Sequence, residues 1–223
     1  MASTQSPPLA RTATLLPAPG SVRLVREVAE LGVFFADDVN VVALSRPLEA
    51  GLREEAQSVL ARPSFRVMTP LAPSQGAMGL QARMPDLPRL AADVHFWAEV
   101  LADLTGCEQV GVRLARVESA MCPRFHVDKL TVRVVSTFWG DGTEYLVEQD
   151  VDRRWLGHAA PRVGEEARSA LRAGARERRA QAGDVLLLKG EAWPGNAGRG
   201  AVHRSPPASA EAPRLVMTLD PLD

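Results

Sequence analysis

The second half of the chain consists of short segments in which apolar and polar residues alternate, with glycine-rich turns between them. This alternation has a period of two, which is the pattern of a half-buried β-strand. The predicted strands are residues 110–118, 130–138, 143–148, 184–188, 200–204 and 214–219. Many short strands joined by tight turns are typical of closed or double-sheet antiparallel folds. The sequence therefore predicts a mainly β second half, either an antiparallel barrel or a double-stranded β-helix (jelly roll).

The first half is different, because its longer apolar runs have helical spacing. Its predicted elements are a strand at 37–45, helices at 47–62 and 86–105, and a loop at 63–85. Pro88 suits the first turn of the second helix and Gly106 suits its end. We therefore expect residues 21–106 to form a helical support region, and residues 107–223 to form the jelly-roll core.

Two segments differ from both halves. Residues 1–20 hold Pro, Ser, Thr and Ala without a lasting period, which predicts a flexible tail, with a transit peptide as the alternative. Residues 162–180 carry six arginines against three acids and have helical spacing. We expect a basic helical insertion there, either solvated or acting as a patch for an anionic partner.

Composition excludes several classes of protein. No run approaches the roughly 20 apolar residues that cross a bilayer. The net charge of −1 gives no reason to expect nucleic-acid binding, and two cysteines are too few for a disulfide scaffold. We expect a cytoplasmic protein, in which pairing of exposed edge strands would give a homodimer. The sequence has no phosphate-binding glycine loop, no nucleophile elbow and no Cys-x-x-Cys pair.

The residues best suited to chemistry are His126 and Asp128. Side chains two apart on a strand point to the same face, so this imidazole and this carboxylate would converge. His203, which lies 75 residues after Asp128 on another predicted strand, is the expected third ligand. Two histidines and one carboxylate form a triad that leaves metal positions open.

An arginine follows at a suitable position. Arg214 lies eleven residues after His203, and its guanidinium is expected either to bind a carboxylate through two hydrogen bonds or to lie on the surface of its strand. Arg204 is the alternative. It adjoins His203, so strand parity places it on the opposite face, which favours Arg214.

Cys122, four residues before His126, leaves a second possibility open. With a sulfur ligand, the set of Cys122, His126, Asp128 and His203 would be closed and typical of zinc. Pro123 interrupts the strand, so parity does not place Cys122. The alternative is a buried apolar cysteine.

The order of these residues resembles that of the iron(II)- and 2-oxoglutarate-dependent oxygenases, in particular the prolyl-hydroxylase-like branch. Arg133, Thr137 and a Gly-Asp-Gly turn at 140–142 follow in the order of that branch, and the run at 183–188 resembles its strand ahead of the distal histidine. The resemblance covers about residues 110–220 and implies a cupin-like jelly roll.

The same resemblance implies roles for individual residues. His126, Asp128 and His203 would hold iron(II), and Arg214 would pair with the far carboxylate of 2-oxoglutarate. Further candidates for contacts to this cofactor are Tyr145, Arg133 and Arg204.

A second resemblance involves the segments CPRFHVD at 122–128, GDVLLLKGEAWPGN at 183–196 and GRGAVHRSP at 198–206. They are similar to hallmarks of a bacterial domain-of-unknown-function family, number eighteen twenty-six. That family is associated with zinc-limitation gene sets. The resemblance therefore implies zinc handling as a rival to oxygen chemistry.

The loop before His203 holds the remaining candidates. If this loop lies at the mouth of the site, it supplies substrate contacts from Lys189, Glu191, Trp193 and Asn196. A structural loop with a packed tryptophan is the alternative. Tyr145, the only tyrosine, is expected either to bind an acid or to pack in the core.

Three functional hypotheses follow. The first is a non-haem iron(II)- and 2-oxoglutarate-dependent oxygenase that acts on a small molecule or a protein side chain. The second is a non-catalytic, zinc-handling, cupin-like protein. The third is a cupin-shaped binding module without a metal.

Overall fold

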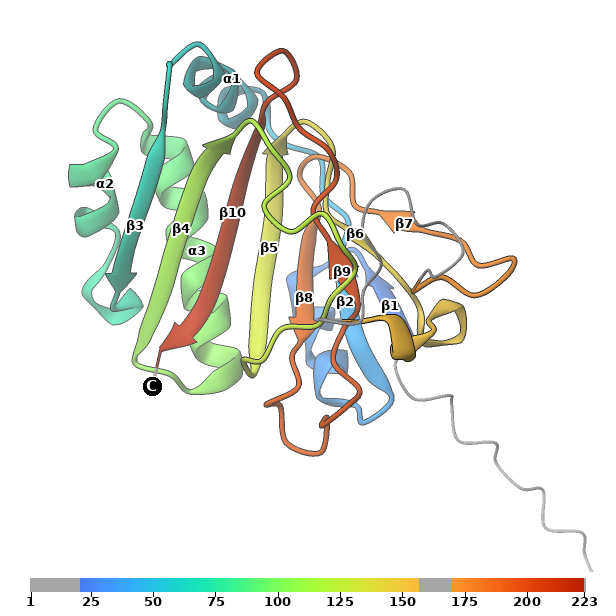
Figure 1. Cartoon of the computed structure of the whole chain (residues 1–223). Helices are drawn as coiled ribbons and strands as arrows, with labels where there is room; N and C mark the ends of the chain where they lie inside the picture. Colours follow the sequence, from blue (N-terminus) through green and yellow to red (C-terminus); the bar gives the residue numbers. More distant parts are fainter. Residues whose placement is uncertain (1–20, 157–169, 223) are drawn as a thin grey trace, which may run out of the picture.

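The computed structural model describes residues 21–156 and 170–222, which form two β-sheets flanked by helices (Figure 1). The larger sheet has seven strands, in the order β1 (Ser21–Val25), β2 (Val39–Leu44), β8 (Val185–Lys189), β5 (Val132–Trp139), β10 (Arg214–Leu222), β4 (Gln109–Val117) and β3 (Arg66–Leu71). The smaller sheet has the order β7 (Arg178–Arg179), β6 (Glu144–Tyr145) and β9 (His203–Arg204). All strand pairs are antiparallel except β1 with β2. The predicted mainly β jelly roll with N-terminal helices is confirmed.

The helices precede most of the strands in the sequence. The α-helices are α1 (Ala50–Leu60), α2 (Met78–Arg83) and α3 (Pro88–Thr105). The short 3-10 helices are η1 (Val28–Phe35), η2 (Pro73–Gln75), η3 (Glu148–Asp150) and η4 (Arg153–Trp155). Pro88 opens α3, and Gly106 ends it in the left-handed conformation at φ 73°, which glycine adopts without strain. No helix among the described residues has both the length and the apolar character needed to cross a bilayer.

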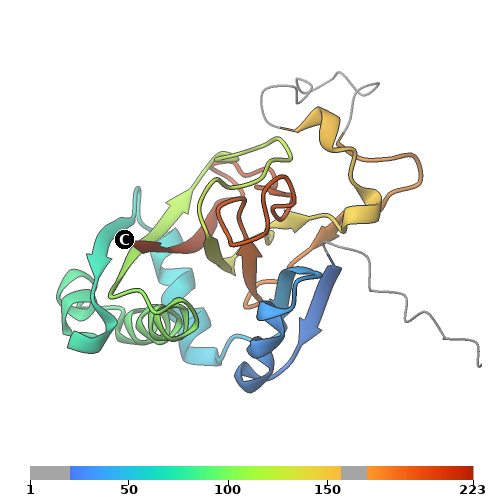
Figure 2. The same cartoon turned by 90° about the horizontal axis from the view of Figure 1, so that it is seen from below.

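The alternating strand pattern gives the large sheet two different faces. On β10, Leu215, Met217 and Leu219 join the main core together with side chains from α1 and α3. The intervening Arg214, Val216 and Thr218 line a cavity on the other face. Figure 2 shows α1 and α3 on one side of the sheet and the β6 segment on the other. This burial stabilises the scaffold that positions the cavity residues.

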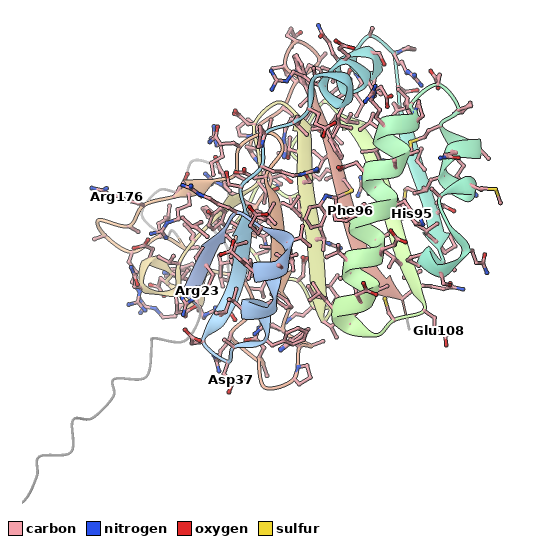
Figure 3. All side chains as sticks on the ribbon, turned by 180° about the vertical axis from the view of Figure 1, so that it is seen from behind. Arg23, Asp37, His95, Phe96, Glu108 and Arg176 are labelled. Atoms are coloured by element: carbon pink, nitrogen blue, oxygen red, sulfur yellow. The ribbon has the colours of Figure 1, made fainter. Side chains whose placement is uncertain are left out.

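The two faces of α3 are equally distinct. Trp97 is buried, whereas its neighbour Phe96 is exposed. His95 is buried, and its Nε2 lies 3.1 Å from the carbonyl oxygen of Pro73. Figure 3, which is seen from behind, shows His95 and Phe96 on this helix in front of the sheet, so His95 belongs to helix packing and not to the metal candidates.

The N-terminal region differs from the predicted helical support, because it also supplies β1, β2 and β3 to the large sheet. Residues 63–85, predicted as a loop, contain β3, η2 and α2. Pro70 within β3 obscured this strand, since proline removes a ladder donor. The structure accommodates it because β3 lies at the edge of the sheet.

The predicted helical insertion at 162–180 is wrong for its described part. Residues 170–180 form a turn with Gly174 at φ 79°, followed by β7. Arg178 and Arg179 pair with Tyr145 and Glu144 of β6, and these tertiary contacts override the local helical spacing. Residues 162–169 and the predicted tail at 1–20 lie outside the described residues.

Candidate metal centre

A pair of backbone hydrogen bonds holds the two histidines together. The N–H of His126 donates to the carbonyl oxygen of His203 at 3.0 Å, and the N–H of His203 donates to that of His126 at 3.1 Å. This reciprocal pairing is that of an antiparallel bridge, which places the two side chains side by side. The imidazole centroids are 4.5 Å apart.

Asp128 completes the group. One potential ligand atom from each of His126, Asp128 and His203 lies within 4.8 Å of the others. The predicted convergence is therefore present, although its expected cause is not. Residues 122–128 form only a single bridge at His126 and no continuous strand, because Pro123 interrupts the segment and β9 is two residues long.

The hydrogen bonds of the imidazoles determine which nitrogen faces the carboxylate. Nδ1 of His126 lies 3.0 Å from the carbonyl oxygen of Arg124, and Nδ1 of His203 lies 3.1 Å from that of Ala201. A carbonyl oxygen can only accept a hydrogen bond, so Nδ1 is the donor and carries the hydrogen in each neutral ring. The unprotonated Nε2 atoms of His126 and His203 are then 3.8 Å and 3.4 Å from the carboxylate oxygens of Asp128.

The two imidazole lone pairs and the negative charge of Asp128 favour a bound cation. Burial lowers the pKa of His203 to about 4, despite the opposing charge of Asp128. His203 is therefore neutral near pH 7, and its lone pair faces a carboxylate at hydrogen-bonding distance without a proton between them. A divalent ion bound by both Nε2 atoms and Asp128 would remove this repulsion, so the donor set fits a metal.

Arg133 orients Asp128. Its Nη1 lies 3.1 Å from both carboxylate oxygens of Asp128, while Nε and Nη2 each bind Asp220 at 2.7 Å. Burial alone would lower the pKa of Arg133, but the hydrogen bonds to Asp220 and the charge of Asp128 raise it. The candidate cofactor residue Arg133 thus contacts the carboxylate of a candidate metal ligand, and sequence reasoning missed Asp220. The alternation along β10 could have indicated Asp220, six positions after Arg214.

Arg214 is almost completely buried, with 1% of its surface exposed. Its Nε donates to the carbonyl oxygen of Asp141 at 2.5 Å, and its Nη2 donates to the hydroxyl of Thr137 at 3.2 Å. Its Nη1 has no hydrogen-bond partner among the described residues. Burial lowers the pKa of Arg214 to about 10, so it is charged near pH 7. A buried cation with an unsatisfied donor fits a bound carboxylate.

A cavity of about 530 Å³ links these residues. Its lining includes His126, His203, Arg133 and Arg214, together with side chains from β3 and β4. The size is typical of a small-molecule site. The cavity thus joins a candidate metal group to a candidate anion-binding group.

Arg204 also lines the cavity but already has partners. It binds Glu144 and Glu177, and its guanidinium lies 4.3 Å from the ring centroid of Phe125. Tyr145 pairs with His203 in the sheet register and packs in an apolar cluster, where burial raises its pKa. Contacts of Arg204 or Tyr145 to a cofactor stay predictions.

The loop after β8 packs against η1. Lys189 is buried, with its Nζ 2.9 Å from the carbonyl oxygen of Ala36. The rings of Trp193 and Phe34 lie 5.0 Å apart. Asn196 donates to Gly190, and Glu191 pairs with Lys129. These four loop residues are outside the lining described for the cavity, and their role toward a substrate stays a prediction.

Cys122 lies near the group but not within it. It is exposed and lines the same cavity, yet the compact ligand group in the described part of the chain contains no cysteine. Its carbonyl oxygen accepts a hydrogen bond from Ser205, which anchors this segment beside β9. A role of its sulfur as a fourth ligand stays a prediction.

Comparison with protein families gives one match, which covers most of the chain. The model of a family described as "Protein of unknown function (DUF1826)" matches residues 26–220. No curated protein matches the sequence significantly.

Solved structures with a similar arrangement include three of low sequence identity. The rice dioxygenase for auxin oxidation has a TM-score of 0.47 and 16% identity, over 91% of this chain and 83% of its own. A Pseudomonas putida prolyl-4-hydroxylase has 0.41 and 15%, over 86% and 96%. HygX from Streptomyces hygroscopicus, with nickel and 2-oxoglutarate bound, has 0.44 and 17%, over 86% of each chain. With TM-scores below 0.5, these similarities assign no activity to this chain.

Proposed function

Since the chain belongs to the DUF1826 family of proteins of unknown function, we propose a function from its own site: a non-haem iron(II)- and 2-oxoglutarate-dependent oxygenase. The observation that carries this proposal is the unsatisfied Nη1 of Arg214 in the cavity that also contains His126 and His203. A metal group alone would suit many functions. A metal group sharing a cavity with a buried, incompletely paired arginine suits a metal-chelating carboxylic acid.

In this function His126, Asp128 and His203 hold iron(II) on one side. Two imidazoles and one carboxylate would hold the ion and would leave further coordination positions open to other ligands. When bound, iron(II) and the keto acid supply oxidation of a substrate C–H bond, with one oxygen atom entering the substrate and the other entering succinate as CO₂ leaves. The protein contributes the geometry and the shielding from water.

Arg214 and Thr137 act on the other end of the keto acid. The Nη1 of Arg214 donates to the carboxylate that does not bind the metal, and the Thr137 hydroxyl holds the guanidinium in place at 3.2 Å. Asp141 fixes the same guanidinium through its carbonyl oxygen. Because these contacts exist before any acid binds, the Arg214 side chain loses little conformational freedom on binding.

The test is an anaerobic titration of the protein with iron(II), with and without 2-oxoglutarate, followed by visible absorbance. We expect a weak charge-transfer band that requires both components. Asp128→Ala removes metal binding, whereas Arg214→Gln keeps it and weakens 2-oxoglutarate binding by about 10-fold or more. Arg154→Gln, an exposed arginine on η4, is the matched control. Unchanged 2-oxoglutarate affinity in Arg214→Gln, or no band in the parent protein, would overturn the proposal.

The rival zinc-handling function rests on one observation, the presence of Cys122 beside the metal group in the same cavity. If the sulfur moves onto the ion, the set closes and zinc is favoured. Zinc affinity that falls strongly in Cys122→Ser, with no 2-oxoglutarate band in the iron(II)-loaded parent, would support zinc handling.

A further inference from the structure

Arg113 lies in the middle of β4, on the cavity face of the large sheet. In the register, it is opposite Met68 of β3 and Thr218 of β10. All three residues line the cavity that contains His126 and His203. In Figure 1, the strands of the smaller sheet lie on the side of β8, and none is drawn beside β3, β4 or β10.

Arg113 has no acidic partner in the part of the chain that the structure describes. No side-chain hydrogen bond or ion pair joins it to the described residues, and its buried Nε is unsatisfied. Burial lowers the pKa of Arg113, and the nearby charges of Arg66 and Arg133 lower it further. The acids Asp128 and Asp220, which lie on the same side, are both bound to Arg133.

The other arginines of the cavity are better satisfied. Arg133 binds two carboxylates, and Arg204 binds Glu144 and Glu177. Arg214 has backbone and hydroxyl partners. Among the described residues, Arg113 and Arg214 are therefore the two cavity arginines without a carboxylate partner, and Arg214 alone has side-chain hydrogen bonds to other groups.

The surroundings of Arg113 are apolar and accessible. Met68 is 57% exposed and Leu222 is 39% exposed, and both line the cavity. Large exposed apolar side chains gathered at a cavity indicate a surface that a ligand covers. The ligand that fits this region has an anionic group next to an apolar portion.

Arg113 and Arg214 mark two different positions. Arg113 is opposite Thr218, which lies four residues after Arg214 on β10. At about 3.3 Å per residue, the two backbone positions are roughly 13 Å apart along the strand. One small dicarboxylic acid bound at Arg214 and the metal group therefore leaves Arg113 available to another molecule.

We propose that Arg113 binds the oxyanion of the substrate, and that the substrate is a small organic anion whose apolar portion lies on Met68 and Leu222. The role of this anion as a substrate rests on the proposed oxygenase function, whereas its binding at Arg113 does not. Carboxylates and phosphate esters share the required chemistry, since a guanidinium binds both through two parallel hydrogen bonds.

The test measures binding of three eight-carbon probes, octanoate, octyl phosphate and octan-1-ol, to the zinc-loaded protein by calorimetry. We expect at least one anionic probe to bind at least 10-fold more tightly than the alcohol. Arg113→Gln should remove that preference, and Arg113→Lys should retain part of it. Arg176→Gln is the matched control, because Arg176 is exposed in the segment before β7, away from β4 (Figure 3). A preference for octanoate or for octyl phosphate identifies the anion.

The same measurements separate this proposal from the oxygenase function. The 2-oxoglutarate affinity of the iron(II)-loaded protein should be unchanged in Arg113→Gln. If anionic probes bind through Arg113 but 2-oxoglutarate does not bind the parent protein, the oxygenase function fails and the anion site stands. Equal affinity for octanoate, octyl phosphate and octan-1-ol would overturn the anion site. So would a loss of 2-oxoglutarate binding in Arg113→Gln, because Arg113 would then belong to the keto-acid position.

Discussion

The chemistry of the candidate centre depends on hydrogen bonds made away from the metal position. Backbone carbonyl groups determine the tautomers of His126 and His203, so both Nε2 lone pairs face Asp128. Arg133 donates a hydrogen bond to the carboxylate of Asp128 and is itself fixed by hydrogen bonds to Asp220. Such outer contacts orient the ligands and adjust their basicity. Arg133 is therefore a positioning residue.

Replacing Arg133 tests this positioning. We expect Arg133→Gln to weaken zinc or iron(II) binding by about 10- to 100-fold, because Asp128 loses the group that orients it. Asp220→Asn should have a smaller effect, since Arg133 keeps its contacts to Asp128. Competition with a chelator measures the affinities, and thermal unfolding of the metal-free variants reports any loss of fold. Metal affinity equal to that of the parent in a folded Arg133→Gln variant would contradict the assigned role.

The segments that carry the ligands have little regular structure of their own. β9 has two residues, and His126 belongs to an isolated bridge. The loop after β8 supports these segments. The N–H of Gly190 donates to the carbonyl oxygen of Thr131 at 2.8 Å, and the N–H of Glu191 donates to the backbone carbonyl oxygen of Asp128 at 2.9 Å. A Cβ at Gly190 would overlap the carbonyl oxygen of Leu130 and come within 3.1 Å of that of Asp128.

Gly190→Ala is therefore expected to disturb both stability and metal binding. The overlap should cost about 1 to 3 kcal/mol of unfolding free energy, because backbone atoms must move. It should also weaken metal binding by displacing Asp128. Gly79→Ala is the control, since a Cβ there meets nothing within 4 Å and Gly79 lies in α2. That change should be neutral or stabilise by up to about 1 kcal/mol. Urea unfolding and metal titration measure both effects, and equal stabilities of the two variants would contradict the explanation.

The two halves of the chain form one folding unit. The strand order places β8, from the second half, between β2 and β5, and β3 pairs with β4 at the other edge. Arg46 adds a polar connection, because it binds Asp93 of α3 through two hydrogen bonds and donates to the carbonyl oxygen of Gly183 at 2.9 Å. Its guanidinium lies 5.3 Å from the ring centroid of Trp97. Residues 21–106 thus complete the sheet that carries the site.

Trp97 tests this cooperativity. Trp97→Ala should lower the free energy of unfolding by about 3 to 5 kcal/mol, because it leaves a large cavity in the main core. The adjacent Phe96→Ala should cost less than about 1 kcal/mol, since Phe96 is exposed. Calorimetry should show a single transition, at a lower temperature in Trp97→Ala. Two separate transitions, with only one shifted, would show that the halves unfold independently.

Local patterns predicted most of the strands but failed where a long-range contact determines the secondary structure. The alternation in the second half located β4, β5, β8 and β10 closely, because a half-buried strand shows its period in its own residues. β3 was missed because its proline is acceptable only at a sheet edge, which no local pattern reveals. Residues 170–180 have helical spacing, but β7 pairs with β6 instead.

The sequence by itself determined the donor types and their order: two histidines and an aspartate, followed by an arginine on a later strand. These follow from residue chemistry and from a period of two, both of which are local. Only the tertiary structure distinguished the arginines of the cavity, which are identical in the sequence. It places carboxylates against Arg133 and Arg204 and leaves donors of Arg113 and Arg214 unsatisfied. The physical reason is that the demand of a guanidinium for an anion depends on the groups the fold brings near it, and those groups lie on distant strands.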